Sequence, residues 1–206
     1  MEALLQFLNS VYPLSNECKD HLVKILRIKE LTRKDFLLKE GQVSKEVCFI
    51  EKGLLRCFYI KDGIEVSRWF MREGDVIFSI SSFYDQVSSF EYIQALEDCF
   101  LYYITWEELE YIYKTFLEFN YVGRELTKKY HKLWDRQLYY IQMQSAEERY
   151  RWLLNEHPEL PLRVPAKHIA SWLDITEVTF SKIKRKVTQG SSKKLSFFNS
   201  DQKNAS

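Results

Sequence analysis

The chain has 206 residues, of which 46% are hydrophobic and 16% are aromatic. This length suits one large domain or two small ones, and with this composition the chain can bury a substantial core and need not be disordered. No apolar run approaches the length of a membrane span, and the start of the chain lacks the pattern of a secretory signal. We therefore expect a cytoplasmic protein without a membrane partner.

The charge is distributed unevenly along the chain. From Arg163 to Ser206, nine Lys/Arg stand against three Asp/Glu, a net charge of +6, whereas Met1 to Leu162 carries 21 against 26, a net charge of −5. A basic C-terminal part suggests a polyanionic partner. An ordinary solvated surface with a lysine-rich end would give the same numbers, so charge alone leaves both interpretations open.

The pattern from residue 2 to residue 28 predicts helices, with a break near Tyr12–Pro13. A second helix is expected to begin at Ser15–Glu17, because Ser and Asn side chains cap exposed backbone N–H groups. From about Leu31 to Ile104, short apolar runs alternate with turn residues. This alternation indicates strands.

Glycines separate these expected strands at intervals of 12, 10 and 11 residues: Gly41, Gly53, Gly63 and Gly74. Regular turn signals between short strands predict an antiparallel sandwich or roll. Lys61-Asp62-Gly63 is a good hairpin turn, since Asp and Gly tolerate positive φ.

A long helical pattern follows from Trp106 to Gln144, and it carries two apolar stripes. The first consists of Phe119, Val122, Leu126, Tyr130, Leu133 and Tyr140, and the second of Trp134, Leu138 and Ile141. One stripe can pack on the chain's own body, and the other needs a second surface, for which a partner helix is the simplest solution. We assign the dimer interface to Val122, Leu126, Tyr130, Leu133 and Tyr140. A single helix buried in its own core is the alternative.

Ser145 and Glu148 have the spacing of a capping box, which predicts that a new helix begins there. The segment from His157 to Pro161 is the clearest linker, because proline forces the preceding residue out of helical geometry. A helix-turn-helix pattern follows it.

Residues Ala166 to Arg185 fit a helix-turn-helix, in which two short helices cross closely. The positions that must be apolar are Ile169, Leu173, Ile175, Phe180 and Ile183, and the position that must be small is Ala170. The turn prefers glycine because φ is positive there, and Asp174 is among the few other residues that adopt this conformation at modest cost.

The second helix of this unit has a polar face that suits DNA. Thr176 can cap the helix, and its exposed face carries Glu177, Thr179, Ser181, Lys182, Lys184 and Arg185. Lys and Arg can donate to guanine, Glu can accept from cytosine, and hydroxyls can bind phosphates. A structural helix pair with a polar outer face is the alternative.

The order of these elements resembles the Crp/Fnr family of regulators, and the resemblance extends to about Val187. Gly53-Leu54-Leu55-Arg56 and Glu73-Gly74-Asp75-Val76-Ile77 look like the family's roll turns, and Ile169 to Lys184 resembles its recognition unit. The resemblance implies an α+β fold: an antiparallel β-roll of the cyclic-nucleotide-binding type (a double-stranded β-helix) with flanking helices, then a long dimerisation helix, then the helix-turn-helix. The implied domains are residues 1–117, 118–144 and 145–206.

The resemblance also implies a homodimer that regulates transcription by binding double-stranded DNA. When the family's recognition helix is aligned with this segment, the positions that contact bases correspond to Glu177, Val178, Ser181 and Lys182. The positions that contact phosphates correspond to Thr176, Thr179 and Arg185, and Lys184 lies on the same helix. Val178 stands where several members carry a polar base reader. RNA polymerase and a small-molecule effector of unknown identity are the other partners considered.

The expected effector pocket departs from the nucleotide-binding members of the family. Phe78 and Ser79 replace their Gly-Glu pair, and the phosphate position holds Ser88, Ser89, Phe90 and Glu91 without an arginine. A buried phosphodiester needs charge-assisted partners, and Glu91 would repel it. We predict weak or absent binding of cyclic AMP, with a pocket that is empty, filled by phenylalanines or adapted to another ligand.

Spacing gives no sign of a metal site, a cofactor or a catalytic motif. The four cysteines are expected to be buried thiols, and the four histidines surface or packing residues: Cys18, Cys48, Cys57, Cys99, His21, His131, His157 and His168. No GxSxG, HExxH or P-loop motif occurs, so an enzyme is not expected. The alternative to a regulator is a sensing or scaffold module that has lost specific DNA recognition. Gln189 to Lys194 is expected to be flexible, with Lys193 and Lys194 near phosphates.

Overall fold

The computed structural model describes residues 1–187. The chain forms two compact units that divide between Trp134 and Asp135, inside one long helix. The segment from Gln189 to Lys194, with its two lysines, lies outside the described residues. None of the described helices combines the length and the apolar character needed to cross a membrane.

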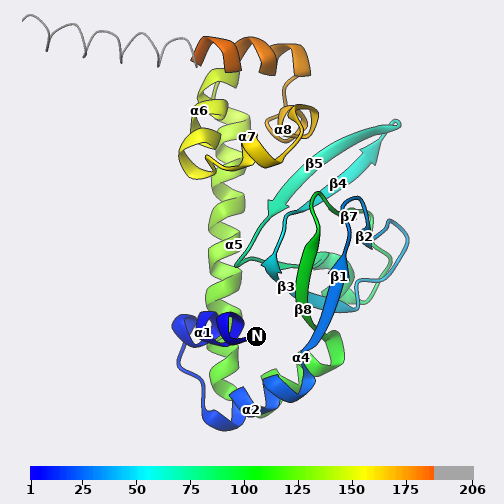
Figure 1. Cartoon of the computed structure of the whole chain (residues 1–206), viewed down its shortest axis with the longest axis vertical. Coiled ribbons are helices and arrows are strands. Elements are labelled where there is room, and N and C mark those ends of the chain that lie inside the picture. The colour runs from blue at the N-terminus through cyan, green and yellow to red at the C-terminus, as the bar shows by residue number, and fades with distance from the viewer. Residues whose placement is uncertain (188–206) are drawn as a thin grey trace, which may run out of the picture. The chain divides into compact units, whose positions relative to one another are not determined.

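The first unit is built on two four-stranded antiparallel sheets (Figure 1). One sheet has the order β1 (Arg27–Leu31), β8 (Cys99–Thr105), β3 (Glu46–Lys52) and β6 (Val76–Ile77). The other has the order β2 (Phe36–Leu38), β7 (Tyr92–Ala95), β4 (Leu55–Lys61) and β5 (Ile64–Met71). Strands that are neighbours within a sheet are mostly distant in sequence, as expected for a β-roll, and the predicted roll is confirmed.

The turn between β4 and β5 has the conformation that its residues favour. Asp62 and Gly63 both have positive φ, +53° and +77°, which is the geometry of a two-residue hairpin turn. The strand ends Lys61 and Ile64 pair directly across it. The hairpin predicted from Lys61-Asp62-Gly63 is therefore confirmed.

Two apolar cores hold the first unit together. The core between the sheets consists of Leu38, Cys48, Ile50, Leu55, Cys57, Ile77, Ile93, Ala95, Cys99 and Leu101. The other joins the β1–β8–β3–β6 sheet to helices through residues such as Leu8, Phe49 and Ile112. All four cysteines are buried free thiols, as predicted, and burial raises the pKa of Cys18 and Cys99 to about 11.

The helices of the first unit are α1 (Glu2–Val11), α2 (Asn16–Ile25), α3 (Ile80–Asp85), α4 (Trp106–Thr115) and the start of α5 (Leu117–Met143). Figure 1 shows α1, α2 and α4 gathered at one end of the roll. Ser15 caps α2 as predicted, accepting from the backbone N–H of Cys18 at 3.2 Å.

Two predictions for this region are wrong. The helical pattern predicts helix as far as residue 28, but α2 ends at Ile25 and β1 begins at Arg27, because Arg27 to Leu31 pair in register with Tyr103 to Cys99. The pattern from Leu31 to Ile104 predicts strands only, yet this region contains α3. Phe83, the apolar anchor of α3, is fully buried in the core beneath the helices.

The second unit contains the end of α5, then α6 (Ala146–Glu156), α7 (Leu160–Arg163), α8 (Ala166–Trp172) and a helix over residues 177–187. The predicted capping box starts α6, since Ser145 and Glu148 each accept from the other's backbone N–H. The segment from His157 to Pro161 is only partly a linker, because α7 begins at Leu160 with Pro161 in its first turn. Proline is tolerated there, where its missing N–H would have no helical acceptor.

Candidate functional site

The second unit contains the predicted helix-turn-helix: α8, a tight turn and the helix of residues 177–187 (Figure 1). The turn is closed by the backbone N–H of Ile175, which donates to the carbonyl oxygen of Ala170 at 3.0 Å. Asp174 has φ of +54°. Asp174 therefore adopts the left-handed conformation for which glycine is usually required.

The packing residues of this motif fall into two groups. Ile169, Ala170, Leu173 and Phe180 are at most 2% exposed, whereas Ile175 and Ile183 are half-buried. Helix α6 provides the base on which they pack, and the ring of Tyr150 meets that of Phe180 edge-on at 5.3 Å. The small Ala170 allows the turn to approach α8 closely.

A residue that the sequence pattern did not identify holds the turn in place. Arg149, on α6, donates from Nη1 to the carbonyl oxygen of Leu173 at 2.7 Å and to that of Asp174 at 3.3 Å. These carbonyls follow the end of α8, where backbone oxygens lack helical partners. Arg149 thus supplies to the turn the donors that a continuing helix would have supplied.

Thr176 begins the second helix, as predicted. Its Oγ1 accepts from the backbone N–H of Thr179 at 3.1 Å, and the two hydroxyls lie 2.9 Å apart. The other side chains assigned to DNA are exposed, with Thr179 half-buried: Glu177, Val178, Ser181, Lys182, Lys184 and Arg185. The structure therefore presents one outward face that carries hydroxyls, a carboxylate and cations.

The cations of this helix are not equivalent. Lys186 forms an ion pair with Glu147 of α6 at 2.5 Å, so its charge is balanced within the unit. Lys182 and Arg185 are exposed and three positions apart, which places them on the same side of the helix. Within residues 1–187, neither has a salt bridge.

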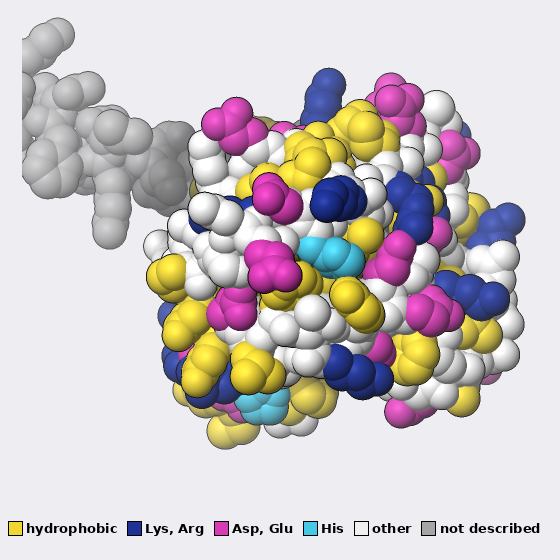
Figure 2. Space-filling model, turned by 90° about the horizontal axis from the view of Figure 1, so that it is seen from below, with side chains coloured by type: hydrophobic (Ala, Val, Ile, Leu, Met, Phe, Trp, Pro, Cys, Tyr) yellow, Lys and Arg dark blue, Asp and Glu magenta, His cyan; other side chains and the backbone are white. Residues whose placement is uncertain are grey.

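Figure 2 shows, for contrast, the end of the molecule seen from below in Figure 1. Lys/Arg and Asp/Glu side chains alternate over this face, with apolar side chains scattered between them. No extended region of that face carries one sign of charge. The face has no obvious complementarity to a polyanion.

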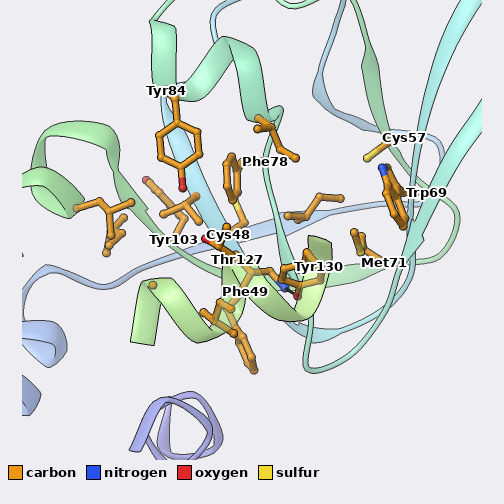
Figure 3. Close-up of a pocket in the computed structure, with 18 of the residues that line it drawn as sticks. Cys48, Phe49, Cys57, Trp69, Met71, Phe78, Tyr84, Tyr103, Thr127 and Tyr130 are labelled. Carbon is orange, nitrogen blue, oxygen red and sulfur yellow. Dashed lines mark hydrogen bonds between the residues drawn. The ribbon is translucent and has the colours of Figure 1, made fainter. Parts of the chain in front are cut away.

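The first unit contains a cavity of about 520 Å³. Its lining residues come from β3, β4, β5, β6 and β8 and from α1, α2, α3, α4 and α5, and Figure 3 shows side chains such as Phe78, Trp69 and Thr127 around it. Its lining is mostly apolar and aromatic. All of its lining residues belong to the first unit.

The structure brings only part of the predicted effector residues to this cavity. Phe78 and Phe90 line it. Ser79 and Ser89 are buried, and their hydroxyl oxygens lie 3.1 Å apart. Ser88 forms an isolated bridge with Val43 and does not line the cavity. The Ser89 hydroxyl also bonds to the backbone of Glu91, and neither of these two serines lines the cavity.

Two charged residues, Glu91 and Arg68, line the cavity. The sequence pattern pointed to Glu91 but not to Arg68. Glu91 is 9% exposed, and burial raises the pKa of its carboxyl group, whereas Ser79 and Arg68 act to lower it. Arg68, on β5, also lines the cavity and stands over the ring of Tyr59 at 5.2 Å. The lining of the cavity therefore contains an arginine, on β5, although the segment around Ser88 has none.

The first apolar stripe of α5 makes contacts within its own chain. Val122 is fully buried in the core of the first unit, and Leu126 packs against that core. The Tyr130 hydroxyl accepts from the backbone N–H of Val76 at 2.8 Å. Tyr140 stacks on Trp152 in the second unit at 4.9 Å, and Leu133 is half-buried.

The second apolar stripe remains accessible. Trp134 is 45% exposed and Leu138 is 42% exposed, while Ile141 is half-buried. These three residues follow a spacing of four and three, which places them along one side of α5. The structure thus leaves on α5 an apolar surface different from the stripe that the sequence pattern assigned to a partner.

Comparison with known proteins identifies the fold. Residues 28–116 match the family model of the cyclic nucleotide-binding domain. No curated protein matches the chain. Among solved structures, 384 chains match, so the fold is a common one.

Three solved structures illustrate this similarity. FixK2 from Bradyrhizobium japonicum has a TM-score of 0.68 at 19% identity, covering 81% of this chain and 86% of its own. A mutant form of CooA from Carboxydothermus hydrogenoformans has a TM-score of 0.67 at 18% identity, and the match covers 82% of this chain and 78% of CooA. A protein described as a transcriptional regulator of the Crp/Fnr family from Eubacterium rectale has 0.67 at 17%, covering 88% of each chain. The predicted resemblance to Crp/Fnr regulators and the predicted α+β fold are confirmed.

Proposed function

We propose that this chain, which has the fold of the Crp/Fnr transcription regulators, binds specific DNA sequences as a homodimer through the helix of residues 177–187. The observation that carries the proposal is the exposure of Lys182 and Arg185 on one side of that helix. Cations on a recognition helix can donate to guanine edges or to phosphates in the major groove. The hydroxyls of Thr176 and Thr179 add phosphate contacts.

The dimer would form along α5. Exposed apolar side chains at Trp134 and Leu138, with Ile141 beside them, offer a seam for the same helix of a second copy. A two-fold dimer would present two recognition helices to half-sites about one helical turn, roughly 34 Å, apart. We propose this second stripe as the main contact, because Val122 and Leu126 are committed to the core of their own protomer.

The effector would not be cyclic AMP. Ser79 and Ser89 are buried against each other, and the carboxyl group of Glu91 shares the cavity with the one guanidinium among its lining residues, that of Arg68. A cyclic phosphate would have to compete with Glu91 for Arg68. We therefore propose that cyclic AMP binds weakly or not at all.

The test is a gel shift with the DNA upstream of the chain's own coding region, repeated over a series of salt concentrations. Lys182→Ala with Arg185→Ala should abolish the sequence-specific shift and flatten the salt dependence by about one unit of slope for each phosphate that is no longer neutralised. Lys52→Ala with Lys61→Ala, two exposed lysines of the first unit, removes the same charge and should leave the shift unchanged.

An unchanged shift in the first variant would contradict the assignment of the recognition helix. Weak binding by the wild type, indifferent to sequence, would support the alternative of a module that has lost DNA recognition. One observation favours that alternative: Val178, at a position mapped to base reading, is apolar and 64% exposed.

A further inference from the structure

The cavity of the first unit has the size of a small-molecule site. Its volume of about 520 Å³ lies within the range of about 300–1,000 Å³ that is usual for such sites. The native core between the sheets does not fill it, although the side chains around it are large and aromatic.

The mouth of the cavity is apolar and partly open to solvent. Ile80 and Tyr84 of α3 line the cavity and are 60% and 48% exposed, and Phe90 lines it and is 56% exposed. Three large apolar side chains at the rim of one cavity keep apolar area in contact with water. A bound apolar molecule would remove that area from water, which favours binding.

The cavity lining carries one positive and one negative side chain, Arg68 and Glu91. Arg68 and Glu91 both line it, and the guanidinium acts to lower the pKa of the buried carboxyl group. Together the two groups add no net charge to the lining, so an anionic phosphate or carboxylate would meet Glu91 as well as Arg68. A neutral group can accept a hydrogen bond from Arg68 or donate one to Glu91 without adding a charge to the lining.

Two hydroxyl groups in this region already have hydrogen-bond partners: that of Tyr130, which lines the cavity, and that of Ser79, which does not. Tyr130 accepts from the backbone N–H of Val76 at 2.8 Å, and its hydroxyl lies 3.3 Å from Asp75 Oδ1. The hydroxyl of Ser79 lies within hydrogen-bond distance of that of Ser89. Arg68 and Glu91 carry the charged groups of the lining, and these can bond to a ligand's single polar group.

We propose that this cavity binds a neutral, mostly apolar small molecule that carries one uncharged hydrogen-bonding group, which Arg68 and Glu91 receive. The proposal deepens the proposed function, because such a molecule would be the effector of the regulator. Helix α5 contributes Thr127 and Leu126 to the cavity and the exposed stripe to the proposed dimer. A ligand would thus contact the helix through which two copies associate.

The test uses a pair of fluorescent probes with the same skeleton and different charge. N-phenyl-naphthylamine is neutral, and anilinonaphthalene sulfonate carries one negative charge. Titrated into the full chain without DNA, the neutral probe should bind with one site per protomer and at least about tenfold more tightly than the sulfonate. Cyclic AMP in excess should not displace it.

Two variants on adjacent positions of α5 locate the probe. Thr127→Trp adds a large side chain to the lining and should weaken binding of the neutral probe at least about tenfold. Lys128→Trp adds the same side chain at an exposed position outside the lining and should leave binding unchanged. Should Thr127→Trp unfold the chain, Ser81→Trp, at another lining residue, replaces it.

Glu91→Gln tests the polar end. Removing the carboxylate removes its repulsion of an anion, so the sulfonate should bind at least several-fold more tightly and the preference for the neutral probe should fall. Three results would overturn the proposal. The neutral probe could bind equally to the Thr127→Trp and Lys128→Trp variants, the sulfonate could bind the wild type more tightly than the neutral probe does, or cyclic AMP could displace the neutral probe. The gel shift is done without any ligand, so its failure and the failure of probe binding are separate results.

Discussion

Arg149 and Leu173 are 24 positions apart in the sequence, and the guanidinium of Arg149 donates to the carbonyl oxygen of Leu173 at 2.7 Å. The same nitrogen lies 3.3 Å from the carbonyl oxygen of Asp174. Arg149 is 16% exposed, so the contact is shielded from most of the solvent. The turn of the helix-turn-helix therefore depends on a cation from α6, an element outside the motif.

Arg149→Ala should destabilise the second unit. A hydrogen bond to a charged group contributes about 1.5–3 kcal/mol, and the carbonyls of Leu173 and Asp174 would be left without this donor. We expect the free energy of unfolding, measured with urea, to fall by about that amount, and DNA affinity to fall with it. Arg151→Ala, two positions along α6, removes an exposed ion pair with Glu147 and should cost less than about 1 kcal/mol. Equal losses in the two variants would contradict the role of Arg149.

Asp174 tests the conformation of the same turn. Its φ of +54° favours glycine, so Asp174→Gly should keep the fold and change stability by less than about 1 kcal/mol, since relief of backbone strain offsets the greater freedom of glycine when unfolded. Asp174→Val cannot adopt this conformation easily and should cost more than about 1 kcal/mol. Urea unfolding measures both. A stable Val variant would show that the turn can change its conformation.

The helix-turn-helix could be predicted from sequence because its packing is local. Ile169, Leu173 and Phe180 lie within twelve positions, and helical spacing alone brings them together. Arg149 could not be found in this way, because its role depends on where α6 lies against the turn. The same holds for Arg68, which reaches the cavity from β5, whereas the family resemblance points only to the segment after Gly74.

The two stripes of α5 show a different limit. The spacing of apolar residues predicts how many faces a helix buries, but not which face meets the chain's own body. Val122 is buried because the core beneath α1, α2 and α4 is there to receive it, and that core is assembled from segments distant in sequence. Trp134 and Leu138 have the same character in sequence and remain exposed.

Leu138→Glu tests the proposed dimer. The substitution places a charge on the exposed stripe and should convert the protein to a monomer at micromolar concentration, as measured by sedimentation velocity. Met143→Glu, also an exposed apolar residue of α5, lies about 140° around the helix from Leu138 and should leave the dimer intact. A dimer that survives Leu138→Glu, or a wild-type monomer, would contradict the assignment of this stripe.

Gly123 tests how closely α5 packs against α4. A Cβ at this position would overlap the Tyr113 hydroxyl and lie 2.9 Å from its ring atom Cε1, so Tyr113 would have to move. Gly123→Ala should gain about 1 kcal/mol of helix propensity but lose about 1–3 kcal/mol to this overlap, giving no net gain or a loss of stability.

The sign of this effect should reverse when the ring is removed. In a Tyr113→Leu background the overlap is absent, so Gly123→Ala should stabilise the chain by up to about 1 kcal/mol through helix propensity alone. The four proteins form a double-mutant cycle, and urea unfolding gives its coupling energy. Because Tyr113 and Gly123 also line the cavity, binding of the neutral probe should change only in the variants that move or remove the ring. A coupling energy near zero would mean that α4 and α5 are less closely packed than the structure has them.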